Sequence, residues 1–161
     1  SPSAAGTHGR KGKAIMLKEK PFEITPSQIA GFAIANARAF ALGGAAYCRD
    51  HQQSPDEYWC YMGCQFADGW NWVKSSEDLV FGIIGNLLSM GFELLDVSGD
   101  EYEYHVQVIG WPTDPELDYF DLDRADTEAM WKIFIPICDA QAHDFAWHRE
   151  DELVTFTVTR R

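Results

Sequence analysis

The spacing of apolar residues changes at Gly91, and this change limits the folds that the chain can adopt. Before Gly91 the apolar residues recur at helical spacing, as on one face of an amphipathic helix. After Gly91 they alternate with polar residues, as in a strand with one buried face. We therefore expect an α+β fold, in which a helical hairpin and further helices pack on a small antiparallel sheet built from two C-terminal hairpins.

The first half contains clear signals for helix starts. Thr25 and Gln28 can form a capping box, which predicts a helix from Pro26 to His51. Ser54 begins a similar signal, so a second helix is expected to fold back on the first as a tight antiparallel hairpin.

The second half is expected to join helices to hairpins. A third helix precedes Gly91, and Phe92 to Trp111 form the first predicted hairpin, followed by a loop rich in Asp and Pro. A fourth helix is expected to carry Met130, Phe134, Ile137 and Cys138 on its apolar side, with a kink at Pro136. The last hairpin is expected from Asp144 to Thr159.

The charges divide the chain into a short basic segment and a long acidic one. Residues 1–20 hold five basic residues and one acidic residue, and they are expected to be a tail or an expression remnant. Residues 21–161 hold 8 basic and 24 acidic residues, a net charge of −16, and are expected to form a single domain. Nucleic acid and anionic membranes are disfavoured as partners, because phosphate groups bind to clustered Lys and Arg.

Two further features bear on where the protein works. Arg38 and Arg49 interrupt the most hydrophobic region, so no stretch of about 18 unbroken apolar residues is left to cross a membrane. Four cysteines without a recognisable export signal are typical of a reducing compartment. We expect a soluble, cytoplasmic protein.

The first candidate site is a set of soft ligands around the predicted helical hairpin. Cys48 and His51 end the first helix, while Cys60 and Cys64 share a face of the second. If the hairpin brings the four together, zinc or another thiophilic metal is the expected cofactor. The alternative is that two helices pack through small apolar thiols.

The second candidate site is catalytic. Asp139 and His143 are four residues apart on the predicted fourth helix, so Asp139 can orient the imidazole as a base for a Cys138 nucleophile. His148 is a second possible base. The alternative places Cys138 in the core and His143 at a helix C-terminus, where it complements the helix dipole.

The third set of candidates concerns substrate binding. Glu103 and His105 fall on the polar face of the sheet, which lines a pocket if helices cover it and is the solvated face if nothing does. Trp131 and Trp147 belong to a set of six tryptophans that can line a cavity for a flat or apolar ligand. Aromatic residues in such number are also ordinary components of cores and interfaces.

The layout of the C-terminal half resembles two families of small-molecule domains. A helix, the hairpin from Gly91-Phe92 to Val108, and IPICDAQAHDFAWHREDELVTFTV at 135–158 are similar in arrangement to the L-2-amino-thiazoline-4-carboxylate hydrolase-like family and to the 4-vinyl-reductase domain. The resemblance implies a small organic ligand held between helices and sheet. It also implies a cysteine-dependent, ring-opening hydrolysis, with Cys138 as the residue carried across.

Three functions are therefore compatible with the sequence. The first is a small-molecule enzyme, namely a cysteine-dependent hydrolase. The second is a non-enzymatic domain that binds a small ligand or a metal. The third is an accessory subunit whose aromatic surface docks on a larger partner or on another copy of the chain.

Overall fold

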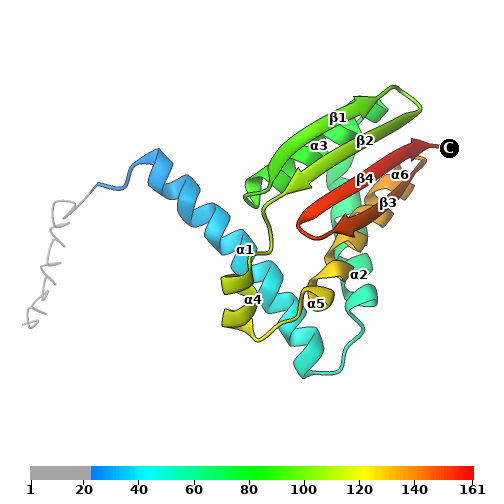
Figure 1. Ribbon diagram of the computed structural model, residues 1–161. Coiled ribbons are helices and arrows are strands. Elements are labelled where there is room, and N and C mark those ends of the chain that lie inside the picture. The colour runs from blue at the N-terminus through cyan, green and yellow to red at the C-terminus, as the bar shows by residue number, and fades with distance from the viewer. Residues whose placement is uncertain (1–22) are drawn as a thin grey trace, which may run out of the picture.

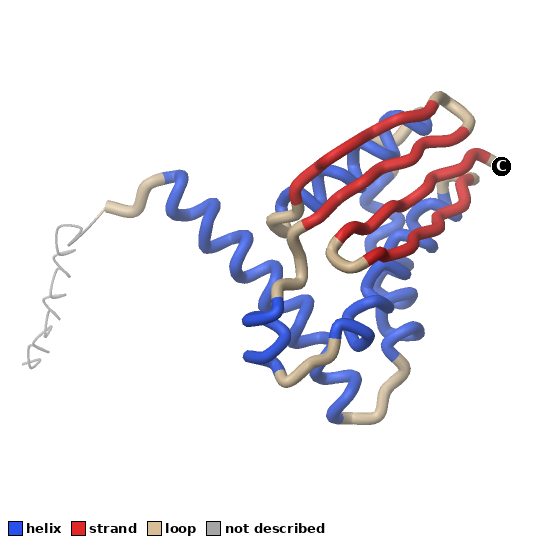
Figure 2. The backbone as a smooth tube through the Cα atoms, in the orientation of Figure 1, coloured by secondary structure: helices blue, strands red, loops and turns tan. Residues whose placement is uncertain are grey.

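The structure is a computed structural model that describes residues 23–161, so the predicted tail at residues 1–20 lies outside the described part. It confirms the α+β fold. Figure 1 shows the helices gathered on one face of a four-stranded antiparallel sheet. The opposite face is bare of helices in the described part of the chain, as Figure 2 shows.

The first two helices form where the capping signals predicted them. Helix α1 spans Pro26–Asp50 and begins with the capping box of Thr25 and Gln28. Helix α2 spans Pro55–Ala67, and the Ser54 side chain accepts a hydrogen bond from the backbone of Glu57.

The prediction of a tight hairpin between these two helices was wrong. They meet near their junction, where the backbone of Gly44 lies against the Tyr58 and Trp59 rings, and then diverge (Figure 1). Helix α2 packs mainly against the 3₁₀ segment Ala129–Ile133 and helix α6, which spans Phe134–Ala140. The reason is that the 3₁₀ segment and α6 offer the bulky aromatic side chains of α2 a larger apolar surface than the small residues of α1 do.

Helix α3 and the two hairpins follow the predicted pattern. Helix α3 spans Ser76–Ser89, and Gly91, with a φ of 84°, ends the helical path. The strands are β1 Glu93–Gly99, β2 Glu103–Ile109, β3 His143–Glu150 and β4 Leu153–Arg160. Their order in the sheet is β1-β2-β4-β3, so the two hairpins join through β2 and β4.

The connection between the hairpins contains more helix than predicted. Helix α4 spans Asp114–Phe120 and α5 spans Arg124–Glu128, where a loop was expected. Helix α6 spans Phe134–Ala140. Pro136, where a kink was expected, lies in the first turn of α6, where a proline needs no hydrogen bond, and the helical path changes from 3₁₀ to α just before it.

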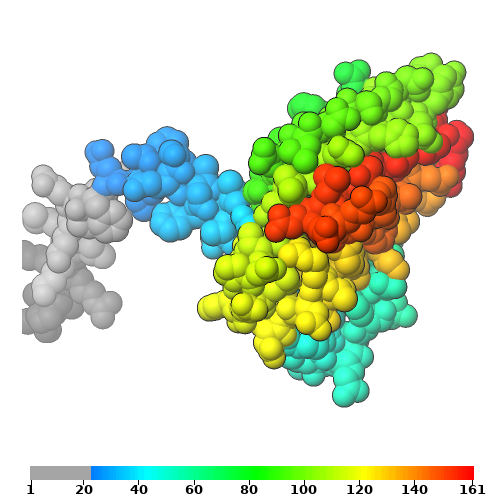
Figure 3. Space-filling model, viewed as in Figure 1, coloured from blue at the N-terminus to red at the C-terminus, as the bar shows by residue number. Residues whose placement is uncertain are grey.

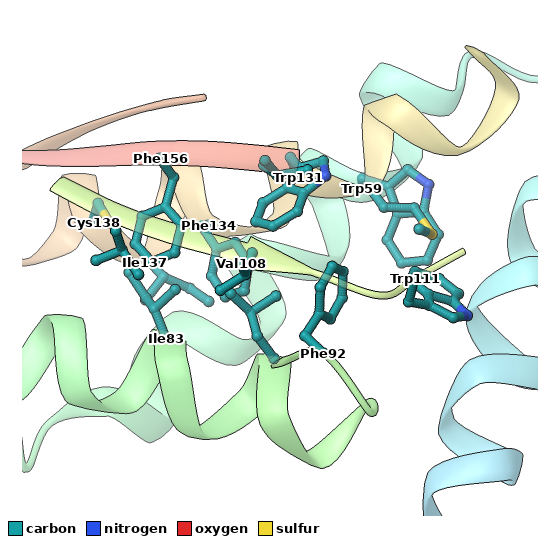
Figure 4. Close-up of a cluster of buried hydrophobic side chains, with 14 of the residues drawn as sticks. Trp59, Ile83, Phe92, Val108, Trp111, Trp131, Phe134, Ile137, Cys138 and Phe156 are labelled. Atoms are coloured by element: carbon teal, nitrogen blue, oxygen red, sulfur yellow. The ribbon is translucent and has the colours of Figure 1, made fainter. Parts of the chain in front are cut away.

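The core lies between the sheet and the helices behind it. Val106 and Phe156 face each other on the central strands, and both are fully buried with Ile83 of α3. Figure 4 shows this cluster with Cys138 and Ile137 of α6 at one end and Trp59 and Trp111 at the other. The inner face of the sheet is therefore covered by α3 and α6.

The N-terminal half of α1 projects away from this body (Figures 1 and 3). Contrary to the sequence-based expectation, α1 is long and apolar enough to cross a membrane by length and composition, and only 11% of its most apolar window is buried. Core helices and N-terminal signal sequences meet the same criteria. Its C-terminal half is packed in the body through Leu42, Ala45 and Cys48.

Two glycines within helices differ sharply in the space around them. A Cβ atom at Gly63 of α2 would collide with the carbonyl oxygen of Ile133, whereas a Cβ atom at Gly85 of α3 would meet nothing within 4 Å. We expect Gly63→Ala to lower the free energy of unfolding by about 1–3 kcal/mol through overpacking. Gly85→Ala is expected to raise it by up to about 1 kcal/mol through helix propensity.

Urea denaturation of both variants measures these two changes. Equal effects of the two substitutions would contradict the close packing of α2 on the 129–133 segment.

Candidate functional site

An open cavity of about 610 Å³ lies between α1, α2, the end of α3 and the segment 129–137. Its wall is mostly aromatic and aliphatic, and it includes Phe40, Trp59, Met62, Trp70, Met90, Phe92, Trp111 and Trp131. The cavity exists because α1 leans away from α2, so that these rings are not covered on one side. Volumes of this order are typical of sites for small organic ligands.

Glycine at one position of α3 sets the shape of this wall. A Cβ atom at Gly82 would press into the Trp70 ring. Trp70 therefore lies directly on the α3 backbone, with its ring centre 6.0 Å from that of Trp72. The cavity wall at this point is rigid, since a large ring held between a helix and a second indole has little freedom to move.

Three side chains that line the cavity have a buried N–H group without an acceptor in the described part of the chain. These groups are Nε1 of Trp59, Nε1 of Trp111 and Nη1 of Arg149. A buried donor without a partner costs about 1–3 kcal/mol. Each of these nitrogens has less than 1 Å² of accessible surface, so a ligand that offers hydrogen-bond acceptors removes part of this cost once the side chains shift to present their N–H groups to the cavity.

The charge of Arg149 is already balanced within the protein. Its Nε donates to Glu128 Oε1, and Glu128 Oε2 accepts a second hydrogen bond from Trp147 Nε1 at 3.3 Å. Trp147 was predicted to contact substrate, but its indole N–H holds Glu128 through this hydrogen bond. Trp131, predicted for the same role, lines the cavity. The free donor of Arg149 therefore suits a neutral acceptor better than a second carboxylate.

A second, polar pocket of about 410 Å³ contains His143. Its lining includes Ser76 and three cationic side chains, Lys74, Arg160 and Arg161. The pocket is therefore locally basic on a protein that is strongly acidic. His143 Nε2 lies 2.8 Å from Ser76 Oγ, at the start of α3. Ser76 was not among the predicted site residues, because no sequence signal marks it beyond its place at the start of the predicted third helix.

The partners of His143 fix its tautomer. Its Nδ1 lies 2.6 Å from the carbonyl oxygen of Gln141, which only accepts, so Nδ1 carries a hydrogen. In the neutral ring Nε2 then accepts from the Ser76 hydroxyl. In the protonated ring Nε2 donates to Ser76 Oγ, and that hydroxyl turns to the Glu101 carbonyl oxygen at 2.6 Å. When Nε2 carries no hydrogen, the single hydroxyl hydrogen of Ser76 serves only one of its two neighbouring acceptors, Nε2 or the Glu101 carbonyl oxygen.

The predicted Cys138–Asp139–His143 site does not assemble. Helix α6 ends at Ala140, so His143 is the first residue of β3 and does not face Asp139 across a helical turn. Asp139 pairs instead with Arg161, at 2.7 Å. Cys138 is fully buried, and burial, with a smaller contribution from the charge of Asp144, raises the pKa of its thiol to about 12.

The predicted metal ligands do not converge either. Among residues 23–161, no group of three or more His, Cys, Asp and Glu side chains is placed to hold a metal ion. Cys48 is buried in the body, where burial raises its pKa, Cys60 is half-buried and Cys64 is exposed. His51 stacks on Tyr47 with ring centres 4.2 Å apart. The divergence of α1 and α2 removes the hairpin geometry on which the expectation rested.

The polar face of the sheet is its solvated side in the described structure. His105 Nε2 lies 2.8 Å from Glu103 Oε1, and its Nδ1 lies 3.3 Å from Thr157 Oγ1, with no helix above them in the described part (Figure 2). His148, the alternative base, is exposed and 3.9 Å from Glu150. These predicted residues form surface pairs rather than a pocket.

The four thiols are expected to react with alkylating reagents at very different rates. At pH 7.5 a thiol with a pKa of about 12 holds more than about a thousandfold less thiolate than an ordinary cysteine. We expect iodoacetamide to label exposed Cys64 within minutes and to leave Cys138 unlabelled until the protein unfolds. Peptide mass spectrometry measures each rate, and rapid native labelling of Cys138 would contradict this assignment.

Comparisons of the chain with protein-family models, with curated proteins and with solved structures find no match. The resemblance to the two families of small-molecule domains therefore stays a prediction, and so does the hydrolysis that it implies.

Proposed function

We propose that this protein binds a small, mostly apolar molecule carrying a neutral hydrogen-bond acceptor in the cavity beside α1 and α2. The observation that carries the proposal is the combination of an aromatic wall with unpaired buried donors on Trp59, Trp111 and Arg149. An apolar cavity with a few convergent polar groups is the usual form of a ligand site.

The chemistry of the wall limits the class of ligand. Aromatic side chains favour a ring system, because stacked and edge-on contacts add to the burial of apolar area. Glu128 lies next to Arg149, so an anionic ligand would bring a second negative charge to an already balanced pair. A ketone, ether or amide attached to an aromatic or polycyclic body fits both conditions.

A matched pair of ligands tests the role of the donors. 2-Acetylnaphthalene and 2-ethylnaphthalene have similar size, and only the first offers a carbonyl acceptor. We expect isothermal titration calorimetry to give about tenfold tighter binding for the ketone, the value of one satisfied buried donor. Equal affinities would contradict a role for the donors, and no binding of either compound would contradict the ligand site.

A matched pair of variants tests the location. Met62 lines the cavity, whereas its neighbour Tyr61 is 61% exposed and does not. Met62→Trp fills part of the cavity and is expected to weaken ketone binding at least about tenfold. Tyr61→Trp adds the same indole outside the cavity and is expected to leave the affinity unchanged.

A second candidate function is supported by the Ser76–His143 pair. The 2.8 Å contact and the fixed tautomer are the arrangement by which a base activates a serine hydroxyl, once that hydroxyl turns toward Nε2 from the Glu101 carbonyl oxygen, to which it donates at 2.6 Å. In such a reaction His143 would take the Ser76 proton as Oγ attacks an ester carbonyl, and would return it to the leaving alcohol. Water would then release the acid, and the nearby Lys74 and Arg160 favour an ester that bears a negative charge, whereas Arg161 is already paired with Asp139 and Asp144.

A fluorophosphonate probe distinguishes this function from a structural contact. If Ser76 is activated, we expect one covalent adduct that disappears in Ser76→Ala and persists in Ser89→Ala, a serine at the other end of α3. If the pair only ties α3 to β3, no adduct forms, and Ser76→Ala lowers the free energy of unfolding by about 1–3 kcal/mol because His143 loses a buried partner.

A further inference from the structure

The exposed half of α1 has almost no charge. Between residues 24 and 48 the single charged residue is Arg38, and its guanidinium pairs with Glu116 at 2.7 Å. Ile29 is 56% exposed, Phe32 64% and Phe40 82%. A helix that is apolar on all sides is normally covered, and an exposed apolar patch of this kind marks a contact surface.

Two apolar faces run along this helix. The inner face, which includes Ile34, Ala41, Ala45 and Cys48, packs against the body of the protein. The outer seam consists of residues spaced alternately by four and three positions: Ile29, Ala33, Asn36, Phe40, Gly43 and Tyr47. Apart from half-buried Gly43 these residues are exposed, and a Cβ atom at Gly43 would meet nothing within 4 Å. This spacing is the pattern by which one helix packs along another.

The spacing of the outer seam reads the same in both directions. In an antiparallel pair of identical helices, Ile29 of one copy lies opposite Tyr47 of the other, and Ala33 lies opposite Gly43. A surface that is complementary to itself in this way is what a two-fold dimer requires. The small residues at Ala33 and Gly43 allow the backbones to approach closely.

The distribution of charge favours the antiparallel direction. The segment that leads into α1 is basic, with five Lys or Arg against one Glu in residues 1–20. The other end of α1 is acidic by one charge: Asp50 ends the helix and pairs with Arg49, and of Asp56 and Glu57 at the start of α2 the first pairs with Lys132. Antiparallel pairing brings the basic segment of one copy toward the acidic end of the other, whereas parallel pairing would bring like charges together.

The length of the projecting part argues against a bilayer as the covering layer. Residues 26–40 form about 22 Å of helix at about 1.5 Å per residue, which is short of the roughly 30 Å of a hydrocarbon core. From Leu42 onward the helix is held in the body of the protein. The net charge of −16 on residues 21–161 also opposes an anionic membrane surface.

We propose that the outer seam of α1 pairs antiparallel with the same seam of a second copy, giving a two-fold dimer. The contact runs from Ile29 to Tyr47, about 27 Å of helix. Phe40 belongs both to this seam and to the rim of the cavity, so the second copy packs at the cavity mouth.

Sedimentation equilibrium of the full chain without added ligand tests the dimer. We expect a dimer at micromolar concentration, and Phe40→Glu is expected to raise the dissociation constant by about a hundredfold or more, as for a central interface residue. Phe81→Glu is the matched control, because Phe81 is 73% exposed on α3, outside the seam, and this variant is expected to remain dimeric.

Cysteine cross-linking tests the direction, in a background where Cys60 and Cys64 are replaced by Ser. The double variant Ile29→Cys, Tyr47→Cys is expected to form a disulfide-linked dimer on mild oxidation, while each single variant stays unlinked because like positions lie at opposite ends of the pair. Linking of the single variants would overturn the antiparallel arrangement. A wild-type monomer at 100 μM (about 10⁻⁴ M) would overturn the dimer, as would a monomer that floats with lipid vesicles.

Discussion

The inner face of the sheet is the constraint on which the rest of the structure depends. Val106, Val108, Val154, Phe156 and Val158 are fully buried on the central strands β2 and β4, so this face must be covered. Helices α3 and α6 cover it, and α2 packs behind α6. No element of the described chain remains to cover the ring surfaces between α1 and α2, and the cavity is the consequence of that shortage.

The same packing decides which reactive residues are available. Cys138 lies on the side of α6 that faces the sheet, so the thiol is buried and stays protonated. His143 is the first residue of β3, and it lies where the edge of the sheet meets the start of α3. The imidazole therefore meets the hydroxyl of Ser76 instead of a thiol, and the polar chemistry of the protein moves from α6 to the contact between the start of β3 and the start of α3.

Capping residues and the spacing of apolar residues were sufficient to predict the helices and strands that they specify directly. Capping residues such as Thr25 and Ser54 gave the starts of α1 and α2, and the alternation around Val106 gave the buried face of β2. Helix α4 was missed although Thr113 and Glu116 form a capping box, because the Asp- and Pro-rich composition was interpreted as a loop. The helix is only 7 residues long, so periodicity gave no support.

The candidate sites were less predictable because they depend on contacts between distant residues. Ser76 and His143 are 67 positions apart, and only the packing of α3 beside the sheet edge brings them together. The cavity depends on the angle between α1 and α2. A capping box fixes where a helix begins but carries no information about the direction in which it leaves the body.

Phe40 connects the two proposals physically. It lines the cavity and it belongs to the outer seam of α1, so a ligand and a second copy of the chain contact the same side chain. If both bind, the free energy of each event depends on the other, and the dependence is reciprocal. Ligand affinity should then vary with protein concentration across the monomer–dimer transition. An affinity independent of concentration would mean that the Phe40 ring keeps one position in both states, so that the cavity and the seam act separately.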